Sequence, residues 1–96
     1  MIKSFGSKVA EDIYHGTNSR HARVLPKDLH PKAHRLLDQL NTITRVETLR
    51  VPPGNHLEKL KGNLVDFWSI RINIQWRVIF KWTDGDAWLV DIVDYH

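Results

Sequence analysis

Residues 67–93 read FWSIRINIQWRVIFKWTDGDAWLVDIV, and this segment is the most informative part of the chain about its fold. Apolar and polar residues alternate in 67–72, 76–82 and 87–93 with the period of two that is typical of half-buried strands. The intervening residues 83–86, TDGD, have the composition of a hairpin turn. The stretch therefore predicts an antiparallel meander of strands.

The alternation also predicts which face of the sheet each side chain occupies. The core face is expected to receive Trp68, Ile70, Ile72, Trp76, Val78, Phe80, Trp82, Trp88, Val90 and Ile92. All four tryptophans fall in this set, so we expect them to be core residues before base-stacking groups. The opposite, open face is expected to receive Phe67, Ser69, Arg71, Arg77, Ile79, Lys81, Asp91, Val93 and Tyr95.

Two helices are predicted before the meander. Ser7 is a candidate N-cap for a helix that continues to about Tyr14 and ends at the GTNS segment, 16–19. A longer helix is predicted to begin near Asp28, a candidate N-cap, with Pro31 in its first turn. Its apolar residues recur at helical spacing and form a core-facing stripe: Leu29, Ala33, Leu36, Leu37, Leu40 and Ile43.

Shorter elements complete the predicted order. Residues 2–5 are expected to form an opening strand, and 57–60 a short strand after the PPGN segment, 52–55, which prevents helix continuation. We therefore predict an α+β fold with an N-terminal strand and two helices on one face of a mainly antiparallel four- to five-stranded sheet. At 96 residues, the chain is expected to be a single domain, 1–96.

The composition excludes several classes of protein. The chain contains no cysteine, so disulfides and thiolate metal sites are excluded. No apolar run approaches the ~20 residues of a membrane span and no signal peptide is visible, so we expect a soluble, cytoplasmic protein without a membrane partner. The 14 Lys and Arg exceed the 11 Asp and Glu, which gives a net charge of +3 and a pI near 9.5 and favours an anionic partner.

The cations in the β half are the first candidates for binding such a partner: Lys59, Lys61, Arg71, Arg77 and Lys81. A guanidinium binds phosphate through its planar fork, and a tyrosine ring can stack on a base. The predicted open face therefore fits a phosphate-bearing polymer. An ordinary solvated sheet face shows the same alternation and is the alternative.

The chain ends in a carboxylate, a phenol and an imidazole, at Asp94, Tyr95 and His96. They follow a predicted buried strand, and side chains on a rigid element suit acid/base chemistry. A polar, solvated tail is the alternative.

No metal or cofactor is expected. His30 and His34 lie four residues apart on a predicted helix, a spacing that can bind zinc, but no third ligand is evident. Two solvated histidines are the simpler interpretation. The chain has neither a Gly-rich phosphate loop nor a serine or cysteine triad signature.

Several segments together resemble the HigB toxins of the RelE/ParE superfamily. They are LRVPPGNHLE (49–58), LKGN (60–63), WSIRIN (68–73), QWRVIF (75–80) and DIVDYH (91–96). The resemblance covers nearly the whole chain. It implies a RelE-like fold and a type II toxin that is a ribosome-dependent, metal-independent endoribonuclease, which cleaves mRNA in the decoding site and inhibits translation and growth.

The resemblance also implies partners. These are a HigA antitoxin with a helix-turn-helix domain, the 70S ribosome with its mRNA, and operator DNA reached only through the antitoxin. Two non-nuclease alternatives stay open. One is a superfamily member that acts by binding, as gyrase-poisoning ParE proteins do, and the other is an antitoxin-binding co-repressor whose nuclease function has decayed.

Catalytic residues are implied by the same resemblance: Glu58, Lys61, Arg77, Asp94, Tyr95 and His96. Arg77 and Lys61 match positions that stabilise phosphate charge, and His96 is the expected general acid. Tyr95 is expected to orient or stack the nucleotide, and Asp94 to hold His96 or the local backbone. Some members carry histidine where this chain has Glu58 and others carry glutamate, so the general base stays open between Glu58 and His96. Lys59, Arg71 and Lys81 are expected to contact RNA or the ribosome.

Overall fold

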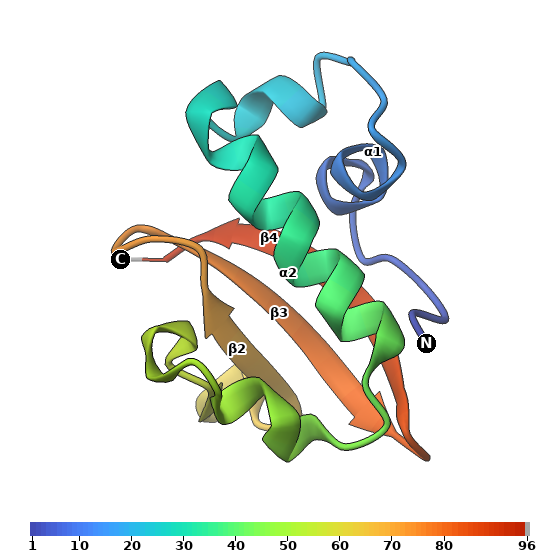
Figure 1. The fold of residues 1–96 in the computed structure, drawn as a ribbon, viewed down its shortest axis with the longest axis vertical. Coiled ribbons are helices and arrows are strands. Elements are labelled where there is room, and N and C mark those ends of the chain that lie inside the picture. Colours follow the sequence, from blue (N-terminus) through green and yellow to red (C-terminus); the bar gives the residue numbers. More distant parts are fainter. Residues whose placement is uncertain (96) are drawn as a thin grey trace.

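The computed structural model describes residues 1–95, in which two α-helices lie against one face of a four-stranded sheet (Figure 1). Neighbouring strands are antiparallel and follow the chain in the order β1-β2-β3-β4. The predicted α+β architecture is confirmed. The elements are α1 (Lys8–His15), α2 (His30–Thr42), β1 (Glu58–Lys59), β2 (Phe67–Arg71), β3 (Trp76–Thr83) and β4 (Asp86–Asp94).

Helix α1 begins and ends as predicted. The Ser7 hydroxyl accepts a hydrogen bond from the Ala10 amide at 3.3 Å, which satisfies a donor that a helix N-terminus leaves without a partner. Gly16 ends the helix in a left-handed conformation with φ of 71°, which glycine adopts without the steric cost of a Cβ.

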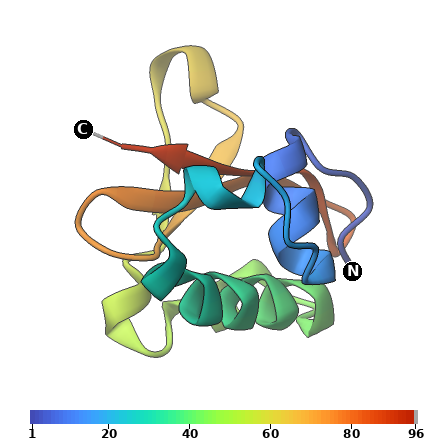
Figure 2. The ribbon, with the colours of Figure 1, turned by 90° about the horizontal axis from the view of Figure 1, so that it is seen from above.

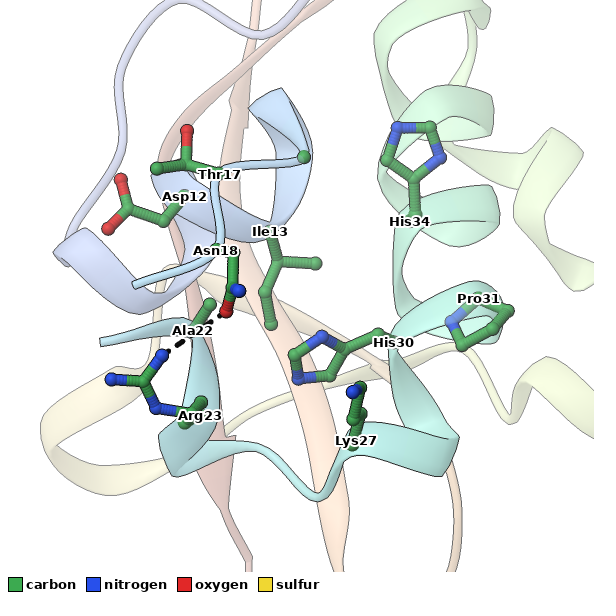
Figure 3. Close-up of a pocket in the computed structure, with 11 residues that line it drawn as sticks. Asp12, Ile13, Thr17, Asn18, Ala22, Arg23, Lys27, His30, Pro31 and His34 are labelled. Atoms are coloured by element: carbon green, nitrogen blue, oxygen red, sulfur yellow. Dashed lines mark hydrogen bonds between the residues drawn. The ribbon is translucent and has the colours of Figure 1, made fainter. Parts of the chain in front are cut away.

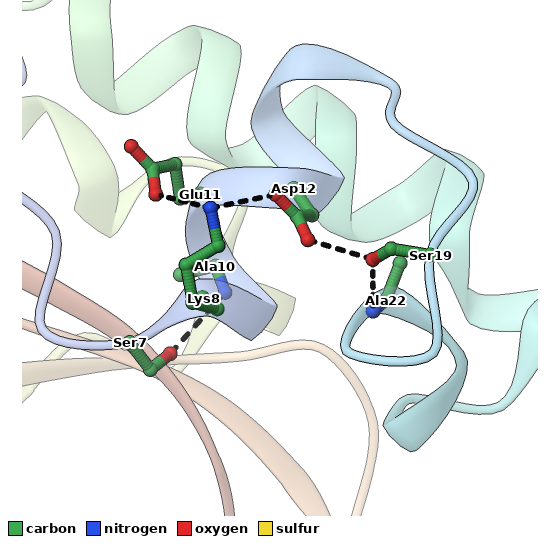
Figure 4. Close-up of polar contacts among 7 residues, drawn as sticks. All are labelled: Ser7, Lys8, Ala10, Glu11, Asp12, Ser19 and Ala22. Atoms are coloured by element: carbon green, nitrogen blue, oxygen red, sulfur yellow. Dashed lines mark hydrogen bonds and ion pairs between the residues drawn. The ribbon is translucent and has the colours of Figure 1, made fainter.

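The turn after α1 is tied back to the helix by one carboxylate (Figure 4). Ser19 donates to Asp12 at 2.6 Å, and the Ser19 hydroxyl in turn accepts from the Ala22 amide at 3.1 Å. Lys8 lies 3.5 Å from the other carboxylate oxygen. The hydrogen bond from Ser19, helped by the charge of Lys8, holds the pKa of Asp12 below its ordinary value, although partial burial opposes this shift.

Helix α2 has the predicted core-facing stripe but not the predicted N-cap. Asp28 lies within a 3-10 turn, Lys27–Leu29, that runs directly into α2, so it is not at the boundary where a side-chain cap acts. Leu29 occupies the cap position without a capping hydrogen bond. The Asp28 prediction is therefore wrong, whereas Pro31 lies in the first turn as predicted.

The core lies between the helices and the sheet. Its fully buried members on α2 and on β2, β3 and β4 include Leu37, Leu40, Ile70, Val78, Phe80 and Val90, and Ala10 of α1 and, from the connecting segments, Leu25 and Leu49 join them. Helices covering one face of an antiparallel sheet leave the other face available for function. Among residues 1–95, no helix is both long and apolar enough to cross a membrane.

The opening segment is not a regular strand. Ile2 and Phe5 form isolated parallel bridges with Ala87 and Val90 of β4. The two β4 partners are separated by a bulge, which interrupts the ladder. The fifth strand allowed for in the prediction is therefore reduced to two bridges.

The bulge also overturns the predicted position of Trp88. Lys81 pairs with Trp88 and Ile79 pairs with Asp91, so β4 contains an extra residue opposite Phe80. This residue reverses the alternation, because side chains on the two sides of a bulge differ by one position. Trp88 is 41% exposed instead of buried. Trp76 is buried, and Trp68 and Trp82 pack against the core as predicted.

Candidate active site

The candidate site lies on the open face, at the end of the sheet where β4 ends and β3 begins. Strand register brings its residues together: Glu58 pairs with Ser69, Arg71 with Arg77, and Arg77 with Val93. Paired residues of antiparallel strands point to the same face. Side chains from all four strands therefore meet around Arg77.

Arg77 is the centre of the site and is only 6% exposed. Its Nη1 donates to the Ser69 hydroxyl at 3.1 Å and lies 3.7 Å from a carboxylate oxygen of Glu58. The guanidinium carbon lies 4.7 Å from the centroid of the Tyr95 ring, a cation–π distance. The Nε of Arg77 is buried and has no hydrogen-bond partner within residues 1–95. In this part of the chain Arg77 thus keeps a donor without an acceptor, and hydrogen bonds from a guanidinium to an anion are among the strongest available to such a donor.

A cavity of about 270 Å³ adjoins this cluster. Tyr95 and Glu58 form part of its wall, so the cavity touches the residues around Arg77. The loop that completes it, drawn in yellow, rises from the sheet on the side opposite α2 (Figure 2). The cavity is lined by Glu58, Lys59, Leu60, Lys61, Leu64 and Tyr95.

The β2–β3 turn fixes the end of the described chain. The Tyr95 amide donates to the Gln75 carbonyl at 2.6 Å, and the Gln75 side chain donates to the Asp94 carboxylate at 3.1 Å. Asn73 stabilises the turn by accepting from the amides of Gln75 and Trp76. Tyr95 is therefore held by the sheet. His96, the predicted general acid, lies outside the described residues.

The predicted RNA-contacting cations are spread more widely. Arg71 lies beside Arg77 in register and also has a buried Nε without a partner in the described part of the chain. Lys81 lies four residues farther along β3, with its ammonium 5.4 Å from the Phe67 ring centroid. Lys59 pairs with Trp68, and its ammonium lies 5.5 Å from that ring.

A sequence profile described as RelE-like toxin of type II toxin-antitoxin system HigB matches residues 3–96. The chain belongs to this HigB family. Toxin HigB-1 of Vibrio cholerae is 40% identical over 87 residues, which are 91% of this chain and 90% of that protein. A protein of Proteus vulgaris named Endoribonuclease HigB is 40% identical over 40 residues, which are 42% of this chain and 44% of that protein. The resemblance inferred from sequence is confirmed.

Solved structures share the fold of this HigB-family chain. The YoeB-YefM complex of Staphylococcus aureus contains a chain that superimposes with a TM-score of 0.61 at 22% identity, covering 100% of this chain and 98% of that chain. A YafQ variant of Escherichia coli gives a TM-score of 0.66 at 19% identity, covering 98% of this chain and 93% of that chain. These similarities confirm the RelE-like fold.

Two residues of the candidate site were not predicted from the sequence. Ser69 is fully buried at the centre of β2 and binds Arg77, and Gln75 holds both Asp94 and Tyr95. A small polar residue in an otherwise bulky strand was a usable signal for Ser69, since buried hydroxyls need a partner. Gln75 gave no comparable signal, because turn residues are commonly polar.

A larger cavity, of about 670 Å³, lies between the end of α1 and the start of α2 (Figure 3). None of the predicted RNA-contacting residues lines it. His30 and His34 line this cavity. The His30 ring forms a hydrogen bond with the Leu25 carbonyl at 2.9 Å, and the His34 ring stacks on Tyr14. Within residues 1–95, no group of three or more His, Asp or Glu side chains is placed to hold a metal ion.

Proposed function

We propose that this HigB-family toxin is a ribosome-dependent endoribonuclease that cleaves mRNA in the decoding site. The observation that carries the proposal is the environment of Arg77, a buried cation on the open face with Tyr95 over its guanidinium and Glu58 at 3.7 Å. The name of the Proteus vulgaris relative, Endoribonuclease HigB, supports the same reaction class.

The proposed reaction uses the ribose of the RNA as the nucleophile. A base removes the proton of the 2′-hydroxyl, the 2′-oxygen attacks the adjacent phosphorus, and the bond from phosphorus to the 5′-oxygen breaks. A proton donated to that oxygen gives a 5′-hydroxyl end, and the other fragment keeps a 2′,3′-cyclic phosphate. Arg77 and Lys61 stabilise the negative charge that develops on the phosphorane oxygens, without a metal ion.

Glu58 suits the role of base, because its half-exposed carboxylate reaches the edge of the Arg77 guanidinium and also lines the smaller cavity. Tyr95 would stack on or orient the nucleotide whose phosphate contacts Arg77, and its ring, 4.7 Å from the guanidinium carbon, supports this role. In this scheme His96 is the general acid and Asp94 positions it. If His96 were the base, another group would have to donate the final proton.

The proposed partners are the 70S ribosome with its mRNA and a HigA antitoxin with a helix-turn-helix domain, which would carry the toxin to operator DNA. The family description, a type II toxin-antitoxin system, supports an antitoxin partner. The YoeB-YefM complex, a structural neighbour, contains a toxin bound to its antitoxin. We place the activity in the cytoplasm, where ribosomes translate.

The proposal is tested by incubating the purified protein with a defined mRNA, with and without 70S ribosomes, and mapping the cut ends. We expect cleavage only with ribosomes. Arg77→Ala should reduce the single-turnover rate by about 100- to 1,000-fold, the usual effect of removing one preorganised donor to a transition-state oxyanion. Arg77→Lys, which keeps the charge but not the planar fork, should be intermediate.

Arg35→Ala is the matched control, because Arg35 is an exposed arginine on α2. It should cleave like the wild type. Circular dichroism of each variant separates lost chemistry from lost folding. A folded wild-type protein that cuts no mRNA on ribosomes would contradict the proposal and favour a toxin that acts by binding, on gyrase or as a co-repressor.

A further inference from the structure

The β4 bulge places a tryptophan on the same sheet face as the candidate active site. Phe67 pairs with Lys81, and Lys81 pairs with Trp88, so the three residues form a row across β2, β3 and β4. We refer to these residues as the aromatic row. The Lys81 ammonium lies 5.4 Å from the Phe67 ring centroid. Two aromatic side chains therefore flank a cation on the open face.

The bulge that exposes Trp88 is held by residues far away in the chain. The Leu89 amide donates to the Ser4 hydroxyl at 2.9 Å, across 85 positions of sequence, and the Val90 amide donates to the Ser4 carbonyl at 3.1 Å. A Cβ on Gly6 would come within 3.0 Å of the Leu89 carbonyl oxygen. The N-terminal segment thus packs closely against the bulge and forms hydrogen bonds with its backbone.

The local conformation is costly. Leu89 has φ of 53°, in the left-handed region that residues other than glycine rarely occupy, and its side chain is 43% exposed. If residues 86–94 formed a regular strand without a bulge, the alternation would place Trp88 on the core face with Val90 and Ile92. The fold instead exposes a large aromatic side chain, and such strain, where it persists, is concentrated at functional positions.

The aromatic row continues the candidate RNA-binding surface. Lys81 is four residues from Arg77 on the same strand and face, about 13 Å away at the usual rise per residue. Arg71 and Arg77 lie at the nearer end of the face. The intervening carboxylate, Asp91, accepts a hydrogen bond from the Ile92 amide at 2.7 Å. One strand of RNA crossing this face could contact both ends.

We infer that Phe67, Lys81 and Trp88 form a second RNA contact, in which unpaired bases stack on the rings and Lys81 binds a neighbouring phosphate. Aromatic rings alternating with cations are the usual means of holding single-stranded RNA. This inference rests on the proposed function, since it extends the RNA surface beyond the cleavage site. The bases could belong to mRNA or to exposed ribosomal RNA, which offer the same chemistry.

The test compares Trp88→Leu, which keeps apolar bulk but removes the ring face, with Trp88→Phe, which keeps a ring. Binding is measured to a fluorescent single-stranded RNA of 12 nucleotides and, separately, to 70S ribosomes without mRNA. We expect Trp88→Leu to weaken one or both by about 5- to 150-fold, the range for loss of a stacked base. Trp88→Phe should remain close to the wild type.

The cleavage assay adds a readout that a merely structural role would not give. Trp88→Leu should raise KM and leave the single-turnover rate at saturating ribosomes unchanged, because Trp88 lies away from the reacting phosphate. Val24→Ala, at another exposed apolar side chain outside the sheet, should change neither. If Trp88→Leu binds the 12-nucleotide RNA more weakly, the contact is with mRNA. If only its binding to ribosomes without mRNA is weaker, the contact is with ribosomal RNA.

Three results would overturn the inference. In the first, Trp88→Leu binds RNA and ribosomes as tightly as the wild type does. In the second, Trp88→Leu loses affinity only for the antitoxin. In the third, the wild-type protein binds neither RNA nor ribosomes. Failure of the proposed function gives a different pattern, in which the wild type binds ribosomes through Trp88 but cuts no mRNA.

Discussion

At the scale of single residues, the main feature is a buried arginine with few partners. Arg77 is covered by the Tyr95 ring and donates a hydrogen bond from one end to Ser69, and its buried Nε has no hydrogen-bond partner among residues 1–95. A buried guanidinium without full compensation costs stability, so such a residue is retained where its charge has a use. Phosphate chemistry is such a use, since it requires a fixed cation.

Ser69→Ala tests whether the serine positions this arginine. The substitution removes the acceptor of the 3.1 Å hydrogen bond from Arg77 Nη1. We expect the free energy of unfolding to fall by about 1.5–3 kcal/mol, the usual range for a hydrogen bond to a charged group. Single-turnover cleavage should slow by about tenfold. Urea denaturation and the ribosome cleavage assay measure the two effects.

A double-mutant cycle with Arg77→Ala supplies the control. If Ser69 acts through Arg77, Ser69→Ala should change cleavage little once the arginine is gone. An equal fold-loss in both backgrounds would show that the serine affects catalysis by another route.

At the scale of elements, local polar contacts determine where α1 ends and how the next segment leaves it. The carboxylate of Asp12 accepts a hydrogen bond from Ser19 in the turn after the helix and forms an ion pair with Lys8, one helical turn earlier. These contacts lower the pKa of Asp12, so the ionised carboxylate stabilises the folded state.

Asp12→Asn should therefore destabilise the protein in a pH-dependent manner. Because the folded-state pKa is below the ordinary value of ~3.9, this stabilisation is complete above that value and is lost as the pH falls through the folded-state pKa. The melting temperature of the variant should be lower than that of the wild type at pH 7, and the difference should shrink below about pH 4. Glu11→Gln is the control at a more exposed carboxylate. A difference that stays constant from neutral to acidic pH would contradict this account.

At the scale of the whole molecule, the two halves of the chain meet along β4. The N-terminal ammonium lies 3.2 Å from Asp86, Ile2 bridges to Ala87, and Phe5 bridges to Val90. The bulge lies between these bridges, so the segment before α1 determines which face Trp88 occupies. Figure 1 shows this N-terminal segment beside β4 at the end of the sheet away from the C-terminus.

Leu89 allows the cost of this arrangement to be measured. Leu89→Val places a β-branched residue at φ of 53° and should lower the free energy of unfolding by about 1–3 kcal/mol. Leu89→Gly, which adopts this conformation freely and gives up a half-exposed side chain, should be neutral or slightly stabilising. Urea denaturation compares them. Equal destabilisation by both would show that side-chain packing, and not backbone strain, dominates at this position.

Much of the fold was predictable because it depends on short-range periodicity. The stripe Ala33, Leu36, Leu37 and Leu40 and the alternation through β3 are properties of the chain that hold wherever the elements pack. The Ser7 and Gly16 caps are local for the same reason. Asp28 failed as a cap because it lies within a 3-10 turn, which moves the cap position of α2 to Leu29.

The α+β class, the caps of α1, the open-face position of Arg77 and membership of the HigB family could all be read from the amino-acid sequence, since they depend on periodicity and on motifs that adjacent residues carry. The convergence of Ser69, Glu58 and Tyr95 on Arg77 and the exposure of Trp88, in contrast, follow from the three-dimensional packing of the chain. Both outcomes depend on residues from separate strands, and in the second case on Ser4, which lies 85 positions from Leu89. Strand register and a bulge are set by such long-range pairing, which no short window of sequence contains.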